Sequence, residues 1–157
     1  MRKRLIASTA ERPRPREQGW LDLERSAVVE LTSEDEHFPI ESAFRSEEAR
    51  GWRAAAPGPQ TIRLVFDSPQ KLKCVSLVFE EDEIARTQEF VLRWSSDGGS
   101  TLKEIVRQQW NFGPPESIRE VEQYRVDLHN VNVLELVINP DIAGGAARAS
   151  LKNFRLS

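Results

Sequence analysis

The segment Glu89–Gln109 reads EFVLRWSSDGGSTLKEIVRQQ and contains two runs that a tight turn separates. Successive side chains of a β-strand point to opposite faces, so an alternation of apolar and polar residues indicates a half-buried strand. The first run alternates in this way and places three large apolar residues on one face: Phe90, Leu92 and Trp94. Asp97-Gly98-Gly99 is typical of a hairpin, because Gly readily adopts the positive φ of tight turns. The segment therefore predicts two antiparallel strands, Glu89–Ser95 and Leu102–Gln109.

Outward from this hairpin, further short apolar or alternating runs predict more strands, with Pro, Gly and Asn turn signals between them. These strands are expected at Ala27–Thr32, Thr61–Phe66, Lys73–Phe79, Tyr124–Leu128, Val133–Ile138 and Ser150–Leu156. Lys73–Phe79 is apolar on both faces, so we expect a central strand there. One short helix is expected at Ile40–Glu48, with Pro39 at its start. The pattern predicts an all-β domain over residues 19–157, a β-sandwich closed as a jelly roll.

The composition narrows the class of protein. The chain has 157 residues, of which 39% are hydrophobic and 30% are charged, and its mean hydropathy is −0.52. These values exclude a membrane protein and argue against global disorder, because no run reaches the ~20 apolar residues of a membrane span. Cys74 is the one cysteine, which excludes an internal disulfide framework; we expect it in the core.

The first 18 residues differ from the rest of the chain and are rich in Arg and Pro. Six basic residues against two acidic ones give residues 1–18 a charge of +4, which leaves −7 for the remainder of a chain whose net charge is −3. We expect a basic tail that serves solubility or binds an acidic partner. Its apolar part, Leu5–Ala7, is shorter than the ~7–15 residues of a signal-peptide core, so we expect a cytoplasmic, reducing location.

Several segments, taken in order along the chain, resemble the discoidin or coagulation factor type C family, which has a galactose-binding-like jelly-roll fold. They are Val29–Glu34, Phe38–Phe44, Gly51–Arg53, Gln60–Pro69, Phe90–Gly98 and Ala149–Leu156. The resemblance covers Trp20 to Ser157 and implies a binding module. It does not identify the ligand, because this fold carries sugar, lipid, peptide and nucleic-acid binders.

Two departures from the family pattern bear on ligands. Arg45-Ser46 stands where the family often has an Asp-Gly pair in a calcium loop, and Asn153 stands where its last strand often supplies a Glu. A cationic Arg is a poor neighbour for an ion that wants several oxygen ligands, so we expect no calcium. The disulfide of the membrane-binding members is missing and the first loop, Glu34–His37, is acidic, so we expect no binding to anionic lipid.

Catalysis requires a nucleophile with a base and an orienting group, or a metal cluster. His37 and His129 are the only histidines, and neither lies at metal-ligand spacing from Cys or from the other. No nucleophile-elbow, P-loop or HExxH pattern is present. The acidic run Glu80–Glu83 is typical of a solvated loop. We therefore expect neither enzyme activity nor a cofactor.

Two polar segments join a strand to a loop, Arg86–Glu89 and Arg107–Phe112. Planar hydrogen-bonding side chains pair with the vicinal hydroxyls of sugars, and aromatic rings cover the apolar side of a sugar ring. The sequence therefore predicts a non-catalytic module that binds carbohydrate, or a similar polar small ligand, through loops at one end of the sandwich. The candidate ligand-binding residues are Arg86, Gln88, Arg107, Gln109, Trp110, His37 and Arg53.

A purely structural interpretation of the same residues stays open. Alternation places Arg107 and Gln109 on one face of their strand and Trp110 on the other. Buried Arg or Gln side chains need hydrogen-bond partners, which Glu120 and Glu122 could provide. In that case a fixed polar network would run inside or across the sandwich, made of Arg86, Glu89, Arg107 and Glu122.

A second function class is an intracellular adaptor that docks a protein or a nucleic acid, because one similar domain belongs to a scaffold of DNA single-strand-break repair. Phosphate binding needs clustered Lys and Arg. Only the tail, residues 2–16, supplies such a cluster, since the remainder of the chain is acidic. If nucleic acid binds, we expect it to bind through residues 1–18.

Overall fold

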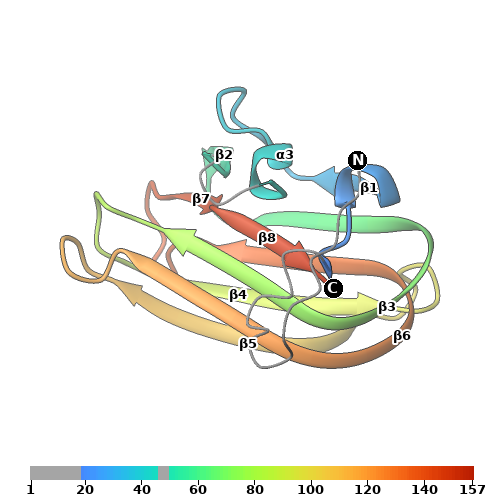
Figure 1. Cartoon of the computed structure of the whole chain (residues 1–157). Helices are drawn as coiled ribbons and strands as arrows, with labels where there is room; N and C mark the ends of the chain where they lie inside the picture. Colours follow the sequence, from blue (N-terminus) through green and yellow to red (C-terminus); the bar gives the residue numbers. More distant parts are fainter. Residues whose placement is uncertain (1–18, 46–49) are drawn as a thin grey trace, which may run out of the picture.

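The computed structural model describes residues 19–45 and 50–157 and shows an almost purely β protein (Figure 1). The basic tail therefore lies outside the described residues. No described helix has the length and apolar character needed to cross a lipid bilayer. In chain order the elements are α2 (Leu23–Ser26), β1 (Ala27–Leu31), α3 (Ile40–Ala43), β2 (Trp52–Pro57), β3 (Gln60–Glu80), β4 (Arg86–Ser95), β5 (Lys103–Phe112), β6 (Arg119–Asn139), β7 (Arg148–Leu151) and β8 (Asn153–Leu156).

Two long strands, β3 and β6, organise the fold. Each has 21 residues, and they pair antiparallel from Gln60 opposite Ile138 to Glu80 opposite Arg119. Their register shifts between Val65 and Cys74, and Figure 1 shows both strands doubling back together at the right-hand side. Asn130 lies in the bend of β6 with a φ of 57°, a conformation that Asn tolerates better than most residues. Each strand therefore contributes one half to each of two packed layers.

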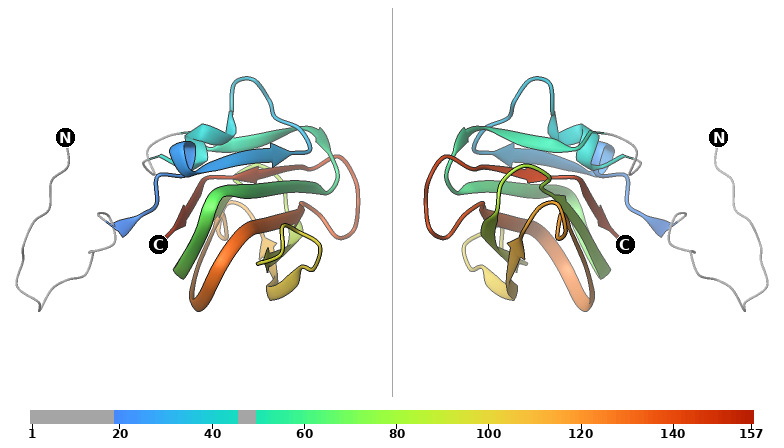
Figure 2. Two further views of the ribbon diagram at one scale, coloured as in Figure 1. Left: turned by 90° about the vertical axis from the view of Figure 1, so that its right-hand side faces the viewer. Right: turned by 90° about the vertical axis from the view of Figure 1, so that its left-hand side faces the viewer.

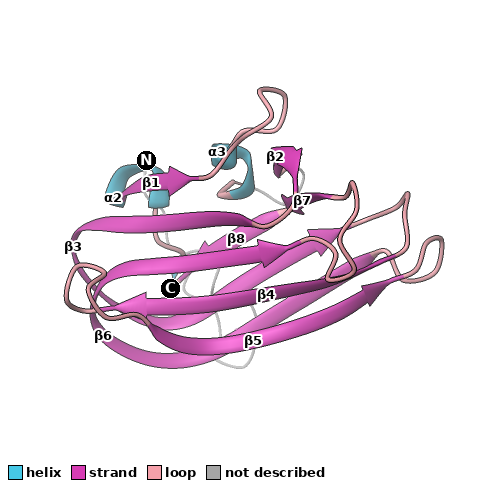
Figure 3. Cartoon of the chain, turned by 180° about the vertical axis from the view of Figure 1, so that it is seen from behind, coloured by secondary structure: helices cyan, strands magenta, loops and turns pink. Residues whose placement is uncertain are grey.

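The two layers are built around these half-strands. The first half of β3 and the second half of β6 form one layer, in the order β1-β3-β6-β4-β5. The second half of β3 forms the other layer with the first half of β6 and with β8. β2 and β7 make a separate two-stranded sheet, and the view from behind shows how strands dominate the molecule (Figure 3). This arrangement confirms the predicted antiparallel β-sandwich.

The core lies between the layers. Phe79 of β3 and Phe90 of β4 come from different layers, and their rings stack with centroids 5.2 Å apart. Fully buried aliphatic residues of both long strands surround this pair. The predicted central strand Lys73–Phe79 is confirmed, because it pairs with β6 on one side and β8 on the other. Cys74 is buried, as expected.

Several predicted boundaries are wrong, for a shared reason. Thr61–Phe66 and Lys73–Phe79 are expected as separate strands because the turn signal Ser68-Pro69 lies between them, yet both belong to β3. Pro69 lies within the register shift, where its missing N–H breaks no ladder hydrogen bond with β6. In the same way, the two expected strands Tyr124–Leu128 and Val133–Ile138 are both part of β6. In β3 and β6, the residues between the expected strands form a bend and do not end the strand.

The other differences lie at the edges of the fold. The run Ser150–Leu156 divides at Lys152 into β7 and β8, which pair with different partners. β2 was not predicted, because its sequence WRAAAP is poor in β-branched residues. The expected helix begins at Ile40, as predicted, but α3 ends at Ala43.

The doubled-back course of β3 and β6 brings their four ends to one end of the sandwich. The loops after β1, β3, β5 and β6 consequently gather there, which we call the loop end. The right-hand view of Figure 2 faces this end, and the left-hand view faces the bends of the two long strands. The loop end is therefore where side chains from distant parts of the sequence can meet.

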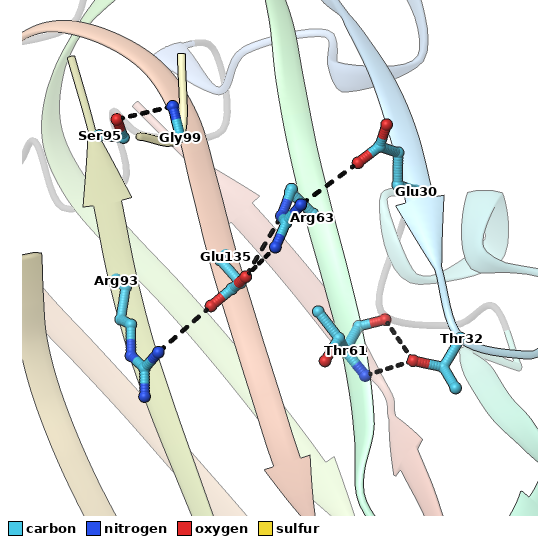
Figure 4. Close-up of polar contacts among 8 residues, drawn as sticks. All are labelled: Glu30, Thr32, Thr61, Arg63, Arg93, Ser95, Gly99 and Glu135. Carbon is cyan, nitrogen blue, oxygen red and sulfur yellow. Dashed lines mark hydrogen bonds and ion pairs between the residues drawn. The ribbon is translucent and has the colours of Figure 1, made fainter. Parts of the chain in front are cut away.

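The outer face of the five-stranded layer carries a row of alternating charges in register across its strands (Figure 4). Glu135 of β6 is central, because only 5% of its side chain is exposed and it lies between Arg63 and Arg93. Arg63 Nη2 donates to Glu135 Oε2 at 2.5 Å, and Arg93 Nη1 lies 3.8 Å from Glu135 Oε1. Glu30 of β1 continues the row, 3.7 Å from Arg63. Opposite charges across neighbouring strands hold β1, β3, β6 and β4 in register.

We expect Glu135→Gln to lower the free energy of unfolding by about 1–2 kcal/mol, since two arginines lose the carboxylate that they share. Urea denaturation followed by tryptophan fluorescence measures the loss. Glu30→Gln is the matched control: its side chain is 59% exposed, so we expect a change below about 0.5 kcal/mol. Equal effects of the two substitutions would contradict the central role of Glu135.

Candidate functional site: a cleft at the loop end

A cleft of about 410 Å³ opens at the loop end. Residues of the β2–β7 sheet line it together with the loop that follows β3. Trp52 and Leu151 are among the lining residues and are buried, so part of the cleft surface rests directly on the core. The remaining lining residues include Phe38, Arg50, Arg53, Glu80, Glu81, Asp82, Glu83, Ile84, Ile118, Ala147, Arg148, Ser150 and Lys152.

Three arginines form what we call the basic side of the cleft: Arg50, Arg53 and Arg148. The guanidinium carbon of Arg53 lies 4.9 Å from the centroid of the Phe38 ring, and that of Arg50 lies 5.3 Å from it. Cation–π contacts of this kind orient a guanidinium without neutralising its charge. Arg148 joins them from β7, with its Nη1 3.8 Å from Asp35 Oδ2.

The acidic side of the cleft is the run Glu80–Glu83, and Glu81 organises it. Glu81 Oε1 accepts a hydrogen bond from Arg86 Nε at 2.7 Å, and Oε2 accepts from the backbone N–H groups of Glu83 and Ile84. Burial by itself would raise the pKa of Glu81, but these hydrogen bonds outweigh it and lower the pKa. Glu81 therefore stays ionised and shapes the loop.

Arg86 connects the cleft to the interior of the sandwich. Its Nη1 donates to the carbonyl oxygen of Pro140 at 2.7 Å and to Gln88 Oε1 at 3.4 Å. Its guanidinium also lies over the ring of Phe112, 4.7 Å from the centroid. Arg86 thus fastens the start of β4 to the loop after β3 and to the end of β6.

The interior chain continues from Gln88 to Glu120, which are both fully buried. Gln88 Nε2 donates to Glu120 Oε1 at 3.0 Å, so Glu120 is the partner that a buried Gln requires. Burial, and then the neighbouring carboxyl of Glu122, raise the pKa of Glu120 from 4.5 to about 9. Glu120 is therefore protonated at neutral pH.

The surroundings of Glu120 contain buried polar atoms with no hydrogen-bond partner among the described residues. They are Arg86 Nη2, Trp110 Nε1, Glu120 Oε2 and the hydroxyl of Tyr124. Burial, followed by the charges of Glu122 and Glu120, also raises the pKa of Tyr124. Unsatisfied buried polar atoms are costly, so this interior region tolerates an additional charge poorly.

Arg107 and Gln109 lie on the outer face of the sheet, away from this interior. Arg107 Nη1 donates to Glu89 Oε1 at 3.3 Å and its Nη2 to Glu104 Oε1 at 3.0 Å. Gln109 Nε2 donates to Glu89 Oε2 at 3.0 Å. The alternation predicted for this strand is confirmed, because Arg107 and Gln109 are exposed whereas Trp110 is half-buried against the core.

The candidate residues thus lie in three separate places. Arg53 lines the cleft, and the carbonyl of His37 accepts a hydrogen bond from Arg50 at 3.4 Å at its margin. The interior holds Arg86, Gln88 and Trp110, and the outer face holds Arg107 and Gln109. The structural interpretation predicts one polar network, but the structure contains two, because Arg86 lies on the inner face of β4 and Glu89 on its outer face. A ligand role for the interior and outer-face residues stays a prediction.

Sequence reasoning missed Phe38, Arg148 and Ser150 of the cleft. Ser150 lies directly opposite Arg53 in the β2–β7 pairing, and Arg148 lies two residues before Ser150, opposite Pro57. No local pattern marks these residues, because nearly 100 positions separate β2 from β7 in the sequence. The acidic run Glu80–Glu83 was recognised, but only as a solvated loop.

The loop where the family resemblance implies calcium does not fit that ion. Asn153 Nδ2 donates to the carbonyl oxygens of Ala43 and Arg45 at 3.2 and 2.8 Å, and Arg155 Nη2 donates to Arg45 at 2.6 Å. Nitrogen donors and a guanidinium charge thus occupy the carbonyl oxygens that a cation would need. Within residues 19–45 and 50–157, no group of three or more His, Cys, Asp or Glu side chains could hold a metal ion.

Comparison with solved structures finds the same fold in carbohydrate-binding modules. A family 32 carbohydrate-binding module of Clostridium perfringens NanJ, in complex with galactose, matches 83% of this chain and 97% of its own, with a TM-score of 0.60 and 13% identity. A pectin-binding carbohydrate-binding module matches 85% of this chain and 91% of its own, with a TM-score of 0.60 and 15% identity.

A further module of family 32, from AlyQ in complex with 4,5-unsaturated mannuronic acid, matches 84% of this chain and 95% of its own, with a TM-score of 0.57 and 16% identity. No protein-family model matches the sequence. No curated protein matches it either. The comparisons therefore establish the jelly-roll β-sandwich fold of this chain.

The pKa of Glu120 predicts a pH dependence of stability. The pKa rises from 4.5 to about 9 on folding, so the folded state favours the protonated carboxyl. The contribution of this carboxyl to the free energy of unfolding is complete below the unfolded pKa and is lost as the pH rises through the folded pKa. We expect the free energy of unfolding to fall between pH 5 and about 9, and Glu120→Gln, which mimics the protonated acid, to flatten this fall. Urea titrations at several pH values measure both slopes. Identical slopes for the two proteins would contradict the assignment.

The nitrogen donors at the loop that follows α3 predict that the chain needs no calcium. We expect Asn153→Ala to lower the free energy of unfolding by about 1–3 kcal/mol, because a buried carbonyl loses its donor. Thermal unfolding measures this change, with the exposed Asn111→Ala as control. A rise in the melting temperature of the unaltered protein on addition of millimolar Ca²⁺ would contradict the assignment.

Proposed function

We propose that this chain is a non-catalytic carbohydrate-binding module that takes a sugar into the loop-end cleft. The observation that carries the proposal is the cleft itself, which combines oriented cations, carboxylates and exposed aliphatic side chains within one concave surface. Its volume of about 410 Å³ lies within the ~300–1,000 Å³ of small-ligand pockets. The shared fold with carbohydrate-binding modules supports the same class of ligand.

The lining of the cleft offers hydrogen-bond donors, hydrogen-bond acceptors and apolar surface to a sugar. Guanidinium groups donate to hydroxyl oxygens, and the carboxylates of Asp82 and Glu83 accept from hydroxyl groups. Ile84 and Ile118 line the same cleft and are 46% and 39% exposed. Their aliphatic surface provides the apolar contact that an aromatic ring provides in many sugar sites, whereas the ring of Phe38 is engaged by Arg50 and Arg53.

The state of Glu81 supports binding without catalysis. Glycoside hydrolysis uses a pair of carboxyl groups, one of which must be protonated to act as the general acid. Glu81 is held ionised by Arg86 and by two backbone N–H groups. It therefore has a structural role in the loop and is no proton donor.

The adaptor function stays a prediction from the sequence. Its nucleic-acid form rests on the basic residues within 1–18, which lie outside the described residues, and its protein-docking form rests on the family resemblance. A cytoplasmic location likewise stays a prediction.

Calorimetric titration with a panel of neutral and acidic mono- and oligosaccharides tests the proposal. We expect at least one sugar to bind with a Kd in the millimolar range or tighter. Ser150→Trp should weaken that binding at least tenfold, because Ser150 lies opposite Arg53 on the cleft surface and an indole would fill the space. Asn111→Trp, which adds the same group on the exposed outer face, should leave the affinity unchanged. Failure of every sugar to bind at millimolar concentration would overturn the proposal.

A further inference from the structure

We infer that the cleft selects sugars that carry a carboxylate, such as uronic acids, over their neutral counterparts, and that Arg53 and Arg148 bind this carboxylate. The inference rests on the proposed function and specifies its ligand class. The observation behind it is a difference between the two sides of the cleft. On the acidic side, Glu80 and Glu81 each have an arginine partner, whereas on the basic side Arg148 alone has a carboxylate partner among the described residues, at 3.8 Å.

On the basic side, the positive charge has little compensation. Arg53 contacts the ring of Phe38, and no described carboxylate lies within ion-pair distance of it. Arg148 has Asp35 as its only described counter-ion, at 3.8 Å, and the other oxygen of that carboxylate already accepts the backbone N–H of His37 at 2.9 Å. A ring contact leaves the formal charge of a guanidinium intact, so this side of the cleft is electropositive.

On the acidic side, half of the run Glu80–Glu83 is neutralised by partners within the protein. Glu80 Oε2 accepts from Arg119 Nη1 at 2.9 Å, and Glu81 Oε1 accepts from Arg86 Nε at 2.7 Å. Asp82 and Glu83 remain, and both are exposed residues of the loop. The repulsion that a ligand carboxylate meets from this side is therefore smaller than the four acidic residues suggest.

The chemistry of the guanidinium group then determines the ligand class. Arg presents a planar fork of N–H donors that matches both oxygens of a carboxylate, and charge-assisted bonds of this kind are roughly twice as strong as neutral ones. Phe38 limits the motion of the Arg53 fork, which reduces the entropy lost on binding. A hydroxymethyl group in place of the carboxylate offers one oxygen and no charge. The remaining hydroxyls of the sugar are then available to Asp82, Glu83 and Ser150.

The test compares trigalacturonate with galactotriose by isothermal titration calorimetry, using the full chain at low ionic strength. We expect trigalacturonate to bind at least tenfold more tightly, and added salt to reduce this preference because it screens charge. Arg53→Gln and Arg148→Gln should each weaken trigalacturonate binding about tenfold and change galactotriose binding less than twofold. Arg125→Gln removes the same charge at an exposed position outside the cleft and should change neither affinity. Unchanged melting temperatures establish that the variants are folded.

The outcomes separate this inference from the proposed function. Equal or tighter binding of galactotriose, with sensitivity to Ser150→Trp, would overturn the acid preference and leave the carbohydrate-binding function in place. An acid preference that persists in the Arg53→Gln/Arg148→Gln double variant would overturn the assignment of these residues. Absence of binding by either sugar, and by every other sugar of the panel, would overturn both the inference and the proposed function.

Discussion

The antiparallel pairing of β3 with β6, on both sides of their shared bend, positions the other strands and the loops. Because the two strands bend together between Val65 and Cys74, each one supplies a half-strand to both layers of the sandwich. The bend also returns all four strand ends to the loop end, where the cleft opens. Two strands that run through the bend, with pairing interrupted only at the register shifts, are less costly than two separate sheets with four additional strand ends. One pairing thus builds the core and positions the site.

Alternation along β4 keeps two polar systems apart. Residues of even number between Arg86 and Phe90 point into the sandwich, so Arg86 and Gln88 join Glu81 and Glu120 inside. Glu89 points outward and pairs with Arg107 on the solvent face. The hydrogen-bonded backbone of the sheet lies between the interior polar groups and those of the solvent face. Residues that are neighbours in the sequence therefore carry out different tasks, which is why a single site made of both segments does not form.

Nitrogen donors take the place of an ion at the loop that follows α3. Asn153 and Arg155 donate to backbone carbonyls there, and these hydrogen bonds hold the loop against β8. The arginines of the cleft are arranged differently, since Phe38 holds Arg53 without neutralising it. The first arrangement satisfies positive charge and polar backbone internally, whereas the second keeps positive charge available to a ligand. This contrast explains why one loop contributes to stability and the neighbouring surface is the candidate site.

The buried and exposed faces of the strands follow from local sequence patterns. Alternation in Glu89–Gln109 and the two-sided apolar run Lys73–Phe79 are local properties of the chain, so the buried face of β4 and the central place of β3 could be predicted from them. The same holds for Asn153, which places an amide where the resembled family often has the carboxylate of a Glu. Whether β3 and β6 would each continue through a bend, and whether Arg53 and Arg148 would line one cleft, could not be predicted in this way. Both outcomes depend on pairing between residues far apart in the sequence, and no local pattern records which strands will pair.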